Sequence, residues 1–252
     1  MFQLIKQRLR ALVPVGLAEL WRRRKIDAIR ARNRGRPSRE IFREIYLENR
    51  WGGEVGTLHS GSGSTEQHAR RYAAAVREFI RERSVRRVVD LGCGDFTVGA
   101  ELLDAGIDYV GVDIVEEVVR ANERTHGSAR VQFRCLDIAE DPLPGGDLCL
   151  IRQVLQHLSN EQIARVLRNI ERYRYVLVTE HYPAPGREAE PNRDKPCGED
   201  VRVYDGSAVY LDRAPFNRPL AATVLDVDAG RWLVQPGERI RTVLLENPGA
   251  AT

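Results

Sequence analysis

The sequence predicts an α/β fold in which a largely parallel sheet is covered by helices on both faces. From residue 85 to residue 179, short apolar runs alternate with amphipathic segments at helical spacing, which is typical of strands joined by crossover helices. The run VVDLGCGDFTVG at 88–99 combines a buried strand, a glycine turn and a helix start. That combination brings bare backbone close to a nucleotide-like ligand.

The expected elements follow one another in a regular order. A helix over 66–83 comes first, where Tyr72, Val76 and Ile80 recur at helical spacing. Strands are then expected at 87–91, 109–113, 131–137, 148–153 and 175–179, with helices ending near 105 and 126 and a third over 161–173. Ser159 and Gln162 form a capping-box signature at the start of the helix over 161–173. A Pro-rich loop is expected over 182–200, and strand-like runs follow near 201–211, 221–227 and 240–245.

The N-terminal residues 1–40 are predicted to form a basic, amphipathic helical extension. The first 50 residues hold fourteen Lys or Arg and five acids, so the basic character of the chain is concentrated there. Residues 1–13 show helical spacing that Pro14 ends, and 30–39 has the composition of a linker. Such a helix suits an anionic membrane surface. Packing of its apolar stripe on the body or on a second subunit is the alternative.

The length and composition indicate one main domain over 41–252 that can bury a full core. No apolar run is long enough to span a bilayer, and no secretory signal is recognisable, so we expect a cytoplasmic protein, with the inner membrane surface as a further possibility. The four cysteines are scattered without the spacing of a zinc site or a disulfide framework. The Gly/Ser run at 60–64 is expected to be either a mobile lid or a plain linker.

Acids stand at the ends of two further strands. Asp113 ends the second strand, where an acid grips ribose hydroxyls at a switch point of the sheet. Asp137 ends the third strand, where a carboxylate can accept a hydrogen bond from an adenine amino group. The third glycine of the turn is Gly99, a spacing wider than that of nicotinamide-binding sequences, which makes a dehydrogenase a poor fit.

These residues resemble those of class I S-adenosylmethionine (SAM) dependent methyltransferases, over about residues 40–245. The motifs are VVDLGCGDFTVG, Asp113 and CLDI, and the runs WGG, SGSGS, CGDF and LQHLS narrow the resemblance to a bacterial small-molecule or sugar O-methyltransferase-like subgroup. The resemblance implies a Rossmann-like seven-stranded methyltransferase sheet with helices on both faces. In that subgroup an acid often stands at the position of Gln153, so this chain departs from the subgroup by having no carboxylate there.

The resemblance also implies which residues bind SAM. One group is expected beside its methionine part and another beside its ribose and adenine, with Arg152 in the same site. The residues in question are Asp90, Gly92, Gly94 and Asp95 for methionine, Asp113 for ribose, and Ile114, Asp137 and Ile138 for adenine. No spacing among the acids indicates a metal site.

The methyl acceptor has to be recognised by other residues. His157 follows the fourth strand and is either the general base or a structural residue at a helix start. His181 is the second candidate base, with the neighbouring Glu180 as the carboxylate that would orient it. Trp51, Asn192, Asp194 and Tyr204 are expected to contact the acceptor, with ordinary loop roles as the alternative.

The sequence therefore predicts SAM-dependent O-methylation of a hydroxyl on a small polar acceptor, such as a sugar or a glycan end. The alternatives are a nucleic-acid or amine N-methyltransferase, which the basic N-terminal segment suggests, and a SAM-binding protein without enzymatic activity. Nucleic acid is the less favoured partner, because the rest of the chain is acidic. The N-terminal helix is expected to mediate either peripheral membrane association or dimerisation.

Overall fold

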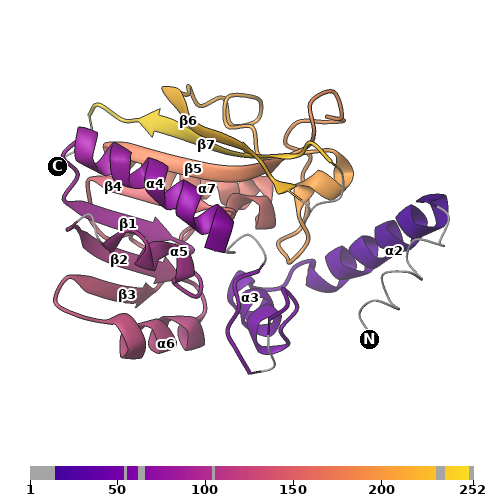
Figure 1. The fold of residues 1–252 in the computed structure, drawn as a ribbon. Coiled ribbons are helices and arrows are strands. Elements are labelled where there is room, and N and C mark those ends of the chain that lie inside the picture. Colours follow the sequence, from indigo (N-terminus) through magenta and orange to yellow (C-terminus); the bar gives the residue numbers. More distant parts are fainter. Residues whose placement is uncertain (1–14, 54–55, 62–65, 104–105, 231–235, 250–252) are drawn as a thin grey trace.

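A seven-stranded sheet forms the centre of the computed structural model, which describes residues 15–53, 56–61, 66–103, 106–230 and 236–249. The strand order is β3-β2-β1-β4-β5-β7-β6 (Figure 1). The five strands from β3 to β5 run parallel, and β7 is antiparallel to both β5 and β6. The strands are β1 (Arg87–Leu91), β2 (Asp108–Asp113), β3 (Val131–Cys135), β4 (Leu148–Arg152), β5 (Tyr175–Tyr182), β6 (Ala222–Asp228) and β7 (Arg239–Glu246). The predicted Rossmann-like seven-stranded architecture is confirmed.

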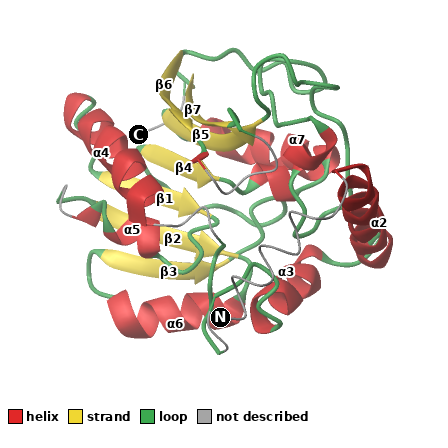
Figure 2. Ribbon diagram, turned by 45° about the vertical axis from the view of Figure 1, so that its right-hand side comes forward, coloured by secondary structure: helices red, strands yellow, loops and turns green. Residues whose placement is uncertain are grey.

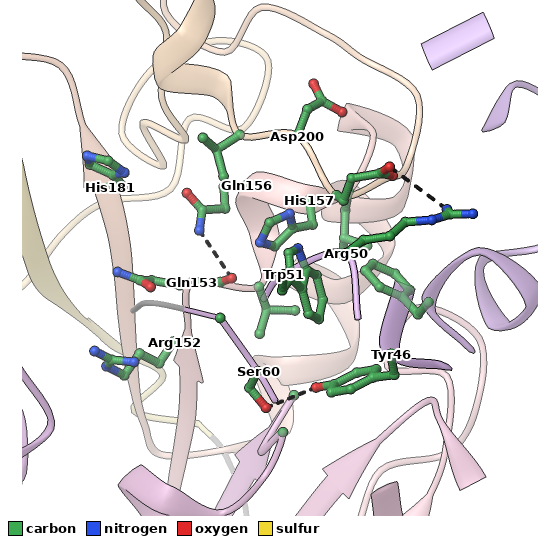
Figure 3. A pocket seen from close by; sticks show the side chains of 18 of the residues that line it. Tyr46, Arg50, Trp51, Ser60, Arg152, Gln153, Gln156, His157, His181 and Asp200 are labelled. Carbon is green, nitrogen blue, oxygen red and sulfur yellow. Dashed lines mark hydrogen bonds and ion pairs between the residues drawn. The ribbon is translucent and has the colours of Figure 1, made fainter. Parts of the chain in front are cut away.

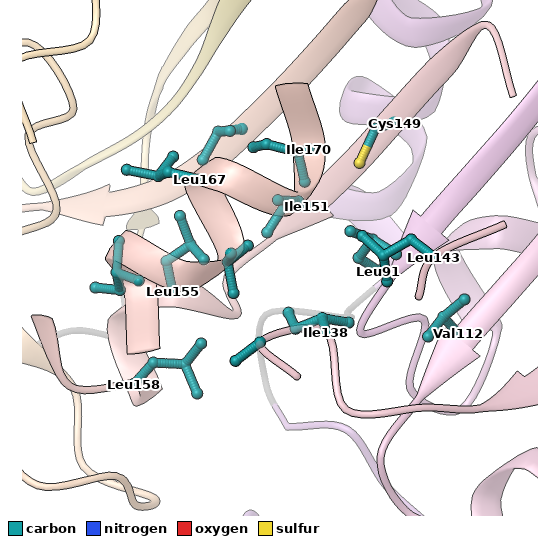
Figure 4. Close-up of a cluster of buried hydrophobic side chains, with 14 of the residues drawn as sticks. Leu91, Val112, Ile138, Leu143, Cys149, Ile151, Leu155, Leu158, Leu167 and Ile170 are labelled. Atoms are coloured by element: carbon teal, nitrogen blue, oxygen red, sulfur yellow. The ribbon is translucent and has the colours of Figure 1, made fainter. Parts of the chain in front are cut away.

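Side chains that follow one another along a strand pack into two separate hydrophobic cores, one on each face of the sheet. In β4, Leu148 and Leu150 pack with α4 (Glu66–Glu82), whereas Cys149 and Ile151 pack with α7 (Asn160–Asn169). Side chains alternate between the two faces of a strand, so a strand covered on both faces is apolar at every position. Figure 1 shows α4 and α7 on opposite faces of the sheet, and Figure 4 shows the core beneath α7.

The connecting helices mostly begin and end where the sequence places them. Ser159 caps α7 with the reciprocal hydrogen bonds of a capping box to Gln162, which confirms that prediction. A short 3₁₀ turn, η4 (Ile170–Arg172), extends α7, and α6 (Glu116–His126) precedes β3. The helix after β1 is shorter than predicted, since α5 covers only Thr97–Ala100 and residues 104–105 lie outside the described ranges.

Helices α2 (Val15–Asn33) and α3 (Ser38–Leu47) lie in the chain before α4. The predicted linker over 30–39 is wrong, because α2 continues through its first part and α3 begins before its end. Ile41 and Ile45 of α3 are fully buried in the core beneath α7, so this helix packs on the body. Helix α2 lies apart from the sheet at one end of the molecule (Figures 1 and 2). The helical pattern predicted for residues 1–13 falls outside the described residues.

The strand predicted near 201–211 is also wrong. Residues Arg202–Asp205 form a 3₁₀ turn, η5, and the segment after it has no regular structure. Val209 and Leu211 are nevertheless buried in the main core, so the apolar pattern reports burial in a loop and not pairing in a sheet. In the described part of the chain, no helix is both long enough and apolar enough to cross a bilayer.

Candidate functional site

A cavity of about 540 Å³ opens at the carboxyl ends of β1, β2, β4 and β5. The chain leaves β1 for β2 and β3 on one side and returns to β4 on the other, so the cavity lies at the switch point of the sheet. All nine residues predicted to bind SAM line it: Asp90, Gly92, Gly94, Asp95, Asp113, Ile114, Asp137, Ile138 and Arg152. Its other walls come from α2, α3, the turn after β4 and the loop over 199–204.

The glycine turn after β1 depends on positions where no side chain fits. Gly92 has φ +80°, and a Cβ there would lie 2.3 Å from a methyl of Val154. Gly94 has φ +56°, and its Cβ would lie 2.2 Å from the hydroxyl of Ser60. Both positions therefore need glycine for the backbone angle and for the close approach of a second segment. The turn is pinned between the segments before α4 and after β4.

Ser60 connects this turn to α3, a contact that the sequence did not reveal. Its backbone N–H donates to the Asp95 carboxylate at 2.9 Å, and its hydroxyl accepts from the Asp95 N–H at 2.6 Å. The hydroxyl of Tyr46 on α3 is 3.1 Å from the same serine oxygen. The Gly/Ser run thus contributes a fixed contact at Ser60, and its residues 62–64 lie outside the described ranges.

Two buried acids form the floor of the cavity. Asp90 accepts a 2.6 Å hydrogen bond from Tyr109, and Asp113 accepts from the N–H groups of Gly94 and Val115 at 3.1 and 3.0 Å. Burial raises the pKa of both carboxyls to about 6. Each carboxylate oxygen has two lone pairs, so both acids keep acceptor capacity for ligand hydroxyl or ammonium groups.

The lining of this half of the cavity fits SAM. Half-buried Asp137 also lines the cavity, and burial raises the pKa of its carboxyl. Leu136, Ile114 and Ile138 provide apolar walls for a flat base. Arg152 at the end of β4 stacks over the ring of Tyr72 at 5.2 Å, and burial lowers the pKa of its guanidinium, against the attraction of Tyr72 and Asp90. Acids at the strand ends and apolar side chains between them match the hydroxyls, the ammonium group and the adenine of SAM.

The turn after β4 is held by Glu180 of β5. Its carboxylate accepts from the N–H groups of Leu155 and Gln156 at 2.9 and 3.2 Å, and burial raises the pKa of this carboxyl to about 8. Glu180 is not among the described residues that line the cavity, and the His181 imidazole donates to Glu238 instead. The prediction that Glu180 orients His181 is therefore wrong, because neighbouring strand residues point to opposite faces. Glu180 positions the 3₁₀ turn η3 (Leu155–His157).

His157 lies in the cavity wall, and its ring contacts Gly198 and Trp51. Its Nδ1 is 3.1 Å from the carbonyl oxygen of Gly198, and its ring lies 5.3 Å from that of Trp51. A carbonyl only accepts, so Nδ1 carries the proton. Burial, with the positive charge of Lys195, lowers the pKa of the imidazole to about 4. His157 is thus a neutral side chain that joins the turn after β4 to the loop near Gly198.

His181 enters the cavity from the end of β5 with a different partner. Its Nε2 is 2.7 Å from the Glu238 carboxylate, and both side chains are buried. A carboxylate accepts only, so Nε2 donates, and in the neutral imidazole Nδ1 keeps a lone pair. Glu238 immediately precedes β7, the antiparallel neighbour of β5. Nothing in the local sequence around His181 indicates this partner.

Gln156 is a further cavity residue that sequence reasoning missed. Its side-chain N–H donates to the carbonyl oxygen of Gln153 at 3.3 Å. The side-chain oxygen is buried and has no hydrogen-bond partner among the described residues. Exchanging the oxygen and nitrogen of the amide would set two acceptors against each other, so the orientation is defined. Figure 3 shows Gln156 together with His157, His181 and Trp51 in the cavity.

The predicted acceptor residues divide into two groups. Trp51 and Tyr204 line the cavity. Asn192 and Asp194 do not, which corrects their predicted placement. The Asn192 amide donates to the carbonyls of Tyr210 and Ala214, and the Asp194 carboxylate accepts from the Asn160 N–H. Their hydrogen-bonding groups are taken up by the backbone of the loops they connect.

Helix α2 also contributes to the cavity, although its sequence shows only a basic extension. Trp21, Arg22 and Lys25 line the opening, and the guanidinium of Arg22 lies 5.8 Å from the centre of the Tyr204 ring. Within the described ranges, no three His, Cys, Asp or Glu side chains are grouped so that they could hold a metal ion.

A comparison with known protein families matches the part of the chain that includes the glycine turn after β1. Residues 89–173 match a family described as a methyltransferase domain. No curated protein matches the chain.

Solved structures of methyltransferases share the fold. Magnesium protoporphyrin IX methyltransferase from Synechocystis PCC 6803, with bound SAM, is 18% identical, with a TM-score of 0.53 over 85% of this chain and 100% of that one. The N-methyltransferase NodS from Bradyrhizobium japonicum WM9, in complex with S-adenosylhomocysteine, is 14% identical, with a TM-score of 0.55 over 82% and 99%. A 1,6-didemethyltoxoflavin N1-methyltransferase from Burkholderia thailandensis is 19% identical, with a TM-score of 0.51 over 82% and 87%.

Proposed function

We propose that this chain, which carries a methyltransferase domain at residues 89–173 within a class I methyltransferase fold, transfers a methyl group from SAM to a hydroxyl of a small polar acceptor. Bound SAM supplies a methyl group that its sulfonium already activates. The protein has to hold the two reactants in line, exclude water and take up the hydroxyl proton. Asp113 and Asp90 would bind the donor, with Asp137 at the adenine end.

The observation that carries the proposal is the hydrogen bond between Glu238 and His181, because His181 lines the same cavity as the predicted donor residues. A general base needs a free lone pair within reach of the proton that it removes. In the neutral imidazole of His181, Nε2 donates to Glu238 and Nδ1 can accept that proton, and the carboxylate stabilises the resulting imidazolium. His181 is therefore the proposed base, and Glu238 is a positioning residue that fixes its tautomer.

His157 is the weaker candidate for this role. Its Nδ1 donates to the Gly198 carbonyl, which leaves a lone pair on Nε2, but burial and the positive charge of Lys195 lower the imidazole pKa to about 4. A base this weak gives little driving force for proton transfer at neutral pH. The structural alternative for His157 thus fits its contacts better than the catalytic one.

A sugar or glycan end is the acceptor we propose. Gln156 offers an unpartnered carbonyl oxygen and His181 an imidazole nitrogen in one cavity, and a compound with several hydroxyls can donate to both. Trp51 and Tyr204 supply aromatic surface for the apolar face of a sugar ring. A buried acceptor such as the Gln156 oxygen favours ligands that carry a donor at this point.

The test is a methyl-transfer screen with radiolabelled SAM over methyl glycosides, phenols, amines and carboxylates. Labelled glycosides support the proposal, whereas labelling only of amines or phenols refutes the sugar assignment. Binding of SAM by calorimetry without product in any class would favour a non-enzymatic SAM-binding protein. We expect His181→Ala to lower kcat by about 100- to 10,000-fold and to leave S-adenosylhomocysteine binding intact. The matched variant His157→Asn should retain most activity, and a reversal of these two results would make His157 the base.

A further inference from the structure

Helix α2 carries apolar side chains on two opposite sides. Ile26 faces the body and is buried. Leu17, Leu20 and Trp21 point the other way, with 59%, 48% and 68% of their surface exposed. Their spacing of three and four residues places them on one side of the helix. They are three of the five large apolar side chains that are exposed in the described part of the chain, so the uncovered apolar surface is concentrated there.

Cations follow this apolar strip directly. Arg23, Arg24 and Lys25 are all exposed, and the ammonium group of Lys25 lies 6.0 Å from the centre of the Trp21 ring. Helix α2 holds six Lys or Arg and two acids. One of the acids, Glu19, is already paired with Arg23 at 2.8 Å. The outward side therefore combines exposed Leu and Trp side chains with an excess of positive charge.

Ion pairs fix how α2 is oriented on the body. Arg30 pairs with Asp200 at 2.9 Å and with Asp205 at 2.5 Å, and Arg32 pairs with Glu199 at 2.6 Å. Asp200 and Glu199 also line the cavity. The loop that forms one cavity wall thus holds the helix, and the outward face keeps a defined direction relative to the cavity. Figures 1 and 2 show α2 at the edge of the molecule.

We propose that the outward face of α2, defined by Leu17, Leu20, Trp21, Arg24 and Lys25, docks on an anionic lipid bilayer. Apolar and aromatic side chains bordered by cations enter the interface between lipid headgroups and acyl chains, and anionic lipids attract the cations. The cytoplasmic leaflet of a membrane carries such lipids.

Charge complementarity favours lipid over a second copy of the chain. A two-fold contact through this face would bring the Arg24 and Lys25 side chains of both copies into one interface, with Asp27 as the only unpaired acid of the helix to offset them. Nucleic acid would attract the cations and leave three large apolar side chains in water. A bilayer accepts both kinds of side chain at once.

Docking would turn the cavity opening toward the lipid, because Trp21 and Lys25 belong both to the outward face and to the opening. Resting on the proposed function, this geometry implies an acceptor whose polar end is presented by a membrane-embedded chain, such as a lipid-linked glycan. The polar end would enter between α2 and Tyr204, and the apolar chain would stay in the bilayer.

The primary test is co-sedimentation of the full chain with phosphatidylcholine vesicles prepared with and without phosphatidylglycerol. We expect binding that requires phosphatidylglycerol and weakens with salt. Leu17→Ser/Leu20→Ser/Arg24→Gln should lower the partition coefficient by at least about tenfold. None of these three residues lines the cavity, so S-adenosylhomocysteine binding should be unchanged. The control Leu47→Ser/Arg124→Gln removes an exposed leucine and an exposed arginine elsewhere and should bind vesicles like the unmodified chain.

A second measurement uses the unmodified chain and Trp21→Phe. Brominated lipid should quench tryptophan fluorescence in the unmodified chain, and Trp21→Phe should lose this quenching. Absence of vesicle binding overturns the proposal. The proposal is also overturned if the triple variant still binds vesicles, if the chain forms a dimer through this face instead of binding lipid, or if it binds RNA but not vesicles. These assays need no methyl acceptor. A long-chain alkyl glucoside in vesicles, compared with methyl glucoside in solution, tests the proposed function separately.

Discussion

The substitution His157→Asn distinguishes a structural histidine from a catalytic one through its effect on stability. An asparagine amide can donate to the Gly198 carbonyl from nearly the position of Nδ1, so the hydrogen bond at 3.1 Å is kept. The substitution removes the titratable group and weakens the tilted ring contact with Trp51. The weaker ring contact lowers stability equally at every pH.

The expected magnitude follows from the imidazole pKa. Burial and Lys195 lower it from 6.5 to about 4 in the folded chain, so the unfolded chain takes up the proton first as the pH falls. The stabilisation is present above pH 6.5 and is lost progressively toward pH 4. The full loss is about 3 kcal/mol of unfolding free energy, of which about 2 kcal/mol is gone by pH 5.

The assay is urea unfolding of both proteins at about pH 7.5 and about pH 5, followed by circular dichroism. Other groups titrate alike in both proteins, so the difference between them isolates His157. Between the two pH values, the unmodified protein should lose about 2 kcal/mol of unfolding free energy relative to His157→Asn. Its higher stability at about pH 7.5 should therefore become smaller or be reversed at about pH 5. A gap that stays constant with pH would refute the reasoning, since the histidine would then titrate equally in both states.

Three further predictions concern the donor site and its support. Gly92→Ala should abolish S-adenosylhomocysteine binding in calorimetry, because its Cβ would lie 2.3 Å from Val154 at a positive φ; binding within a few-fold of the original would contradict this. Asp113→Asn should weaken that binding by about 10- to 100-fold. The affinity of the unmodified protein should fall as the pH drops below about 6, where the carboxyls become protonated, and a flat profile would argue against a carboxylate contact. Glu180→Ala should lower the unfolding free energy by roughly 2 to 4 kcal/mol in urea, because two buried N–H groups of the turn lose their acceptor. Glu180→Gln, which keeps an acceptor, should recover part of this loss.

Much of the fold could be read from local sequence. Strand runs, helix spacing and the capping box at Ser159 are set by neighbouring residues, so the seven strands and the helices α4, α6 and α7 were predicted close to their observed bounds. The acids Asp90, Asp113 and Asp137 line the cavity because the carboxyl ends of parallel strands meet at one edge of the sheet. Apolar content alone was a poor guide after residue 200, where Val209 and Leu211 are buried without forming a strand.

The acceptor half of the cavity was less predictable. Polar residues near the site were assigned by their position after a strand, but a side chain's partners decide its role. Asn192 hydrogen-bonds to backbone 18 and 22 residues away, and Glu180 reaches the turn after β4 across 25 residues. Gln156 became a candidate only because its oxygen is buried without a partner.

By itself, the sequence determined the sheet, the glycine turn and the acids that border the donor half of the cavity, because strand period, backbone angles and strand ends are local properties. Only the tertiary structure decided that Glu238, 57 residues beyond His181, orients that imidazole. It also brought Arg30 to Asp200, 170 residues away, and thereby placed α2 at the opening of the cavity. Contacts between distant segments depend on how the whole chain packs, and no local pattern encodes them.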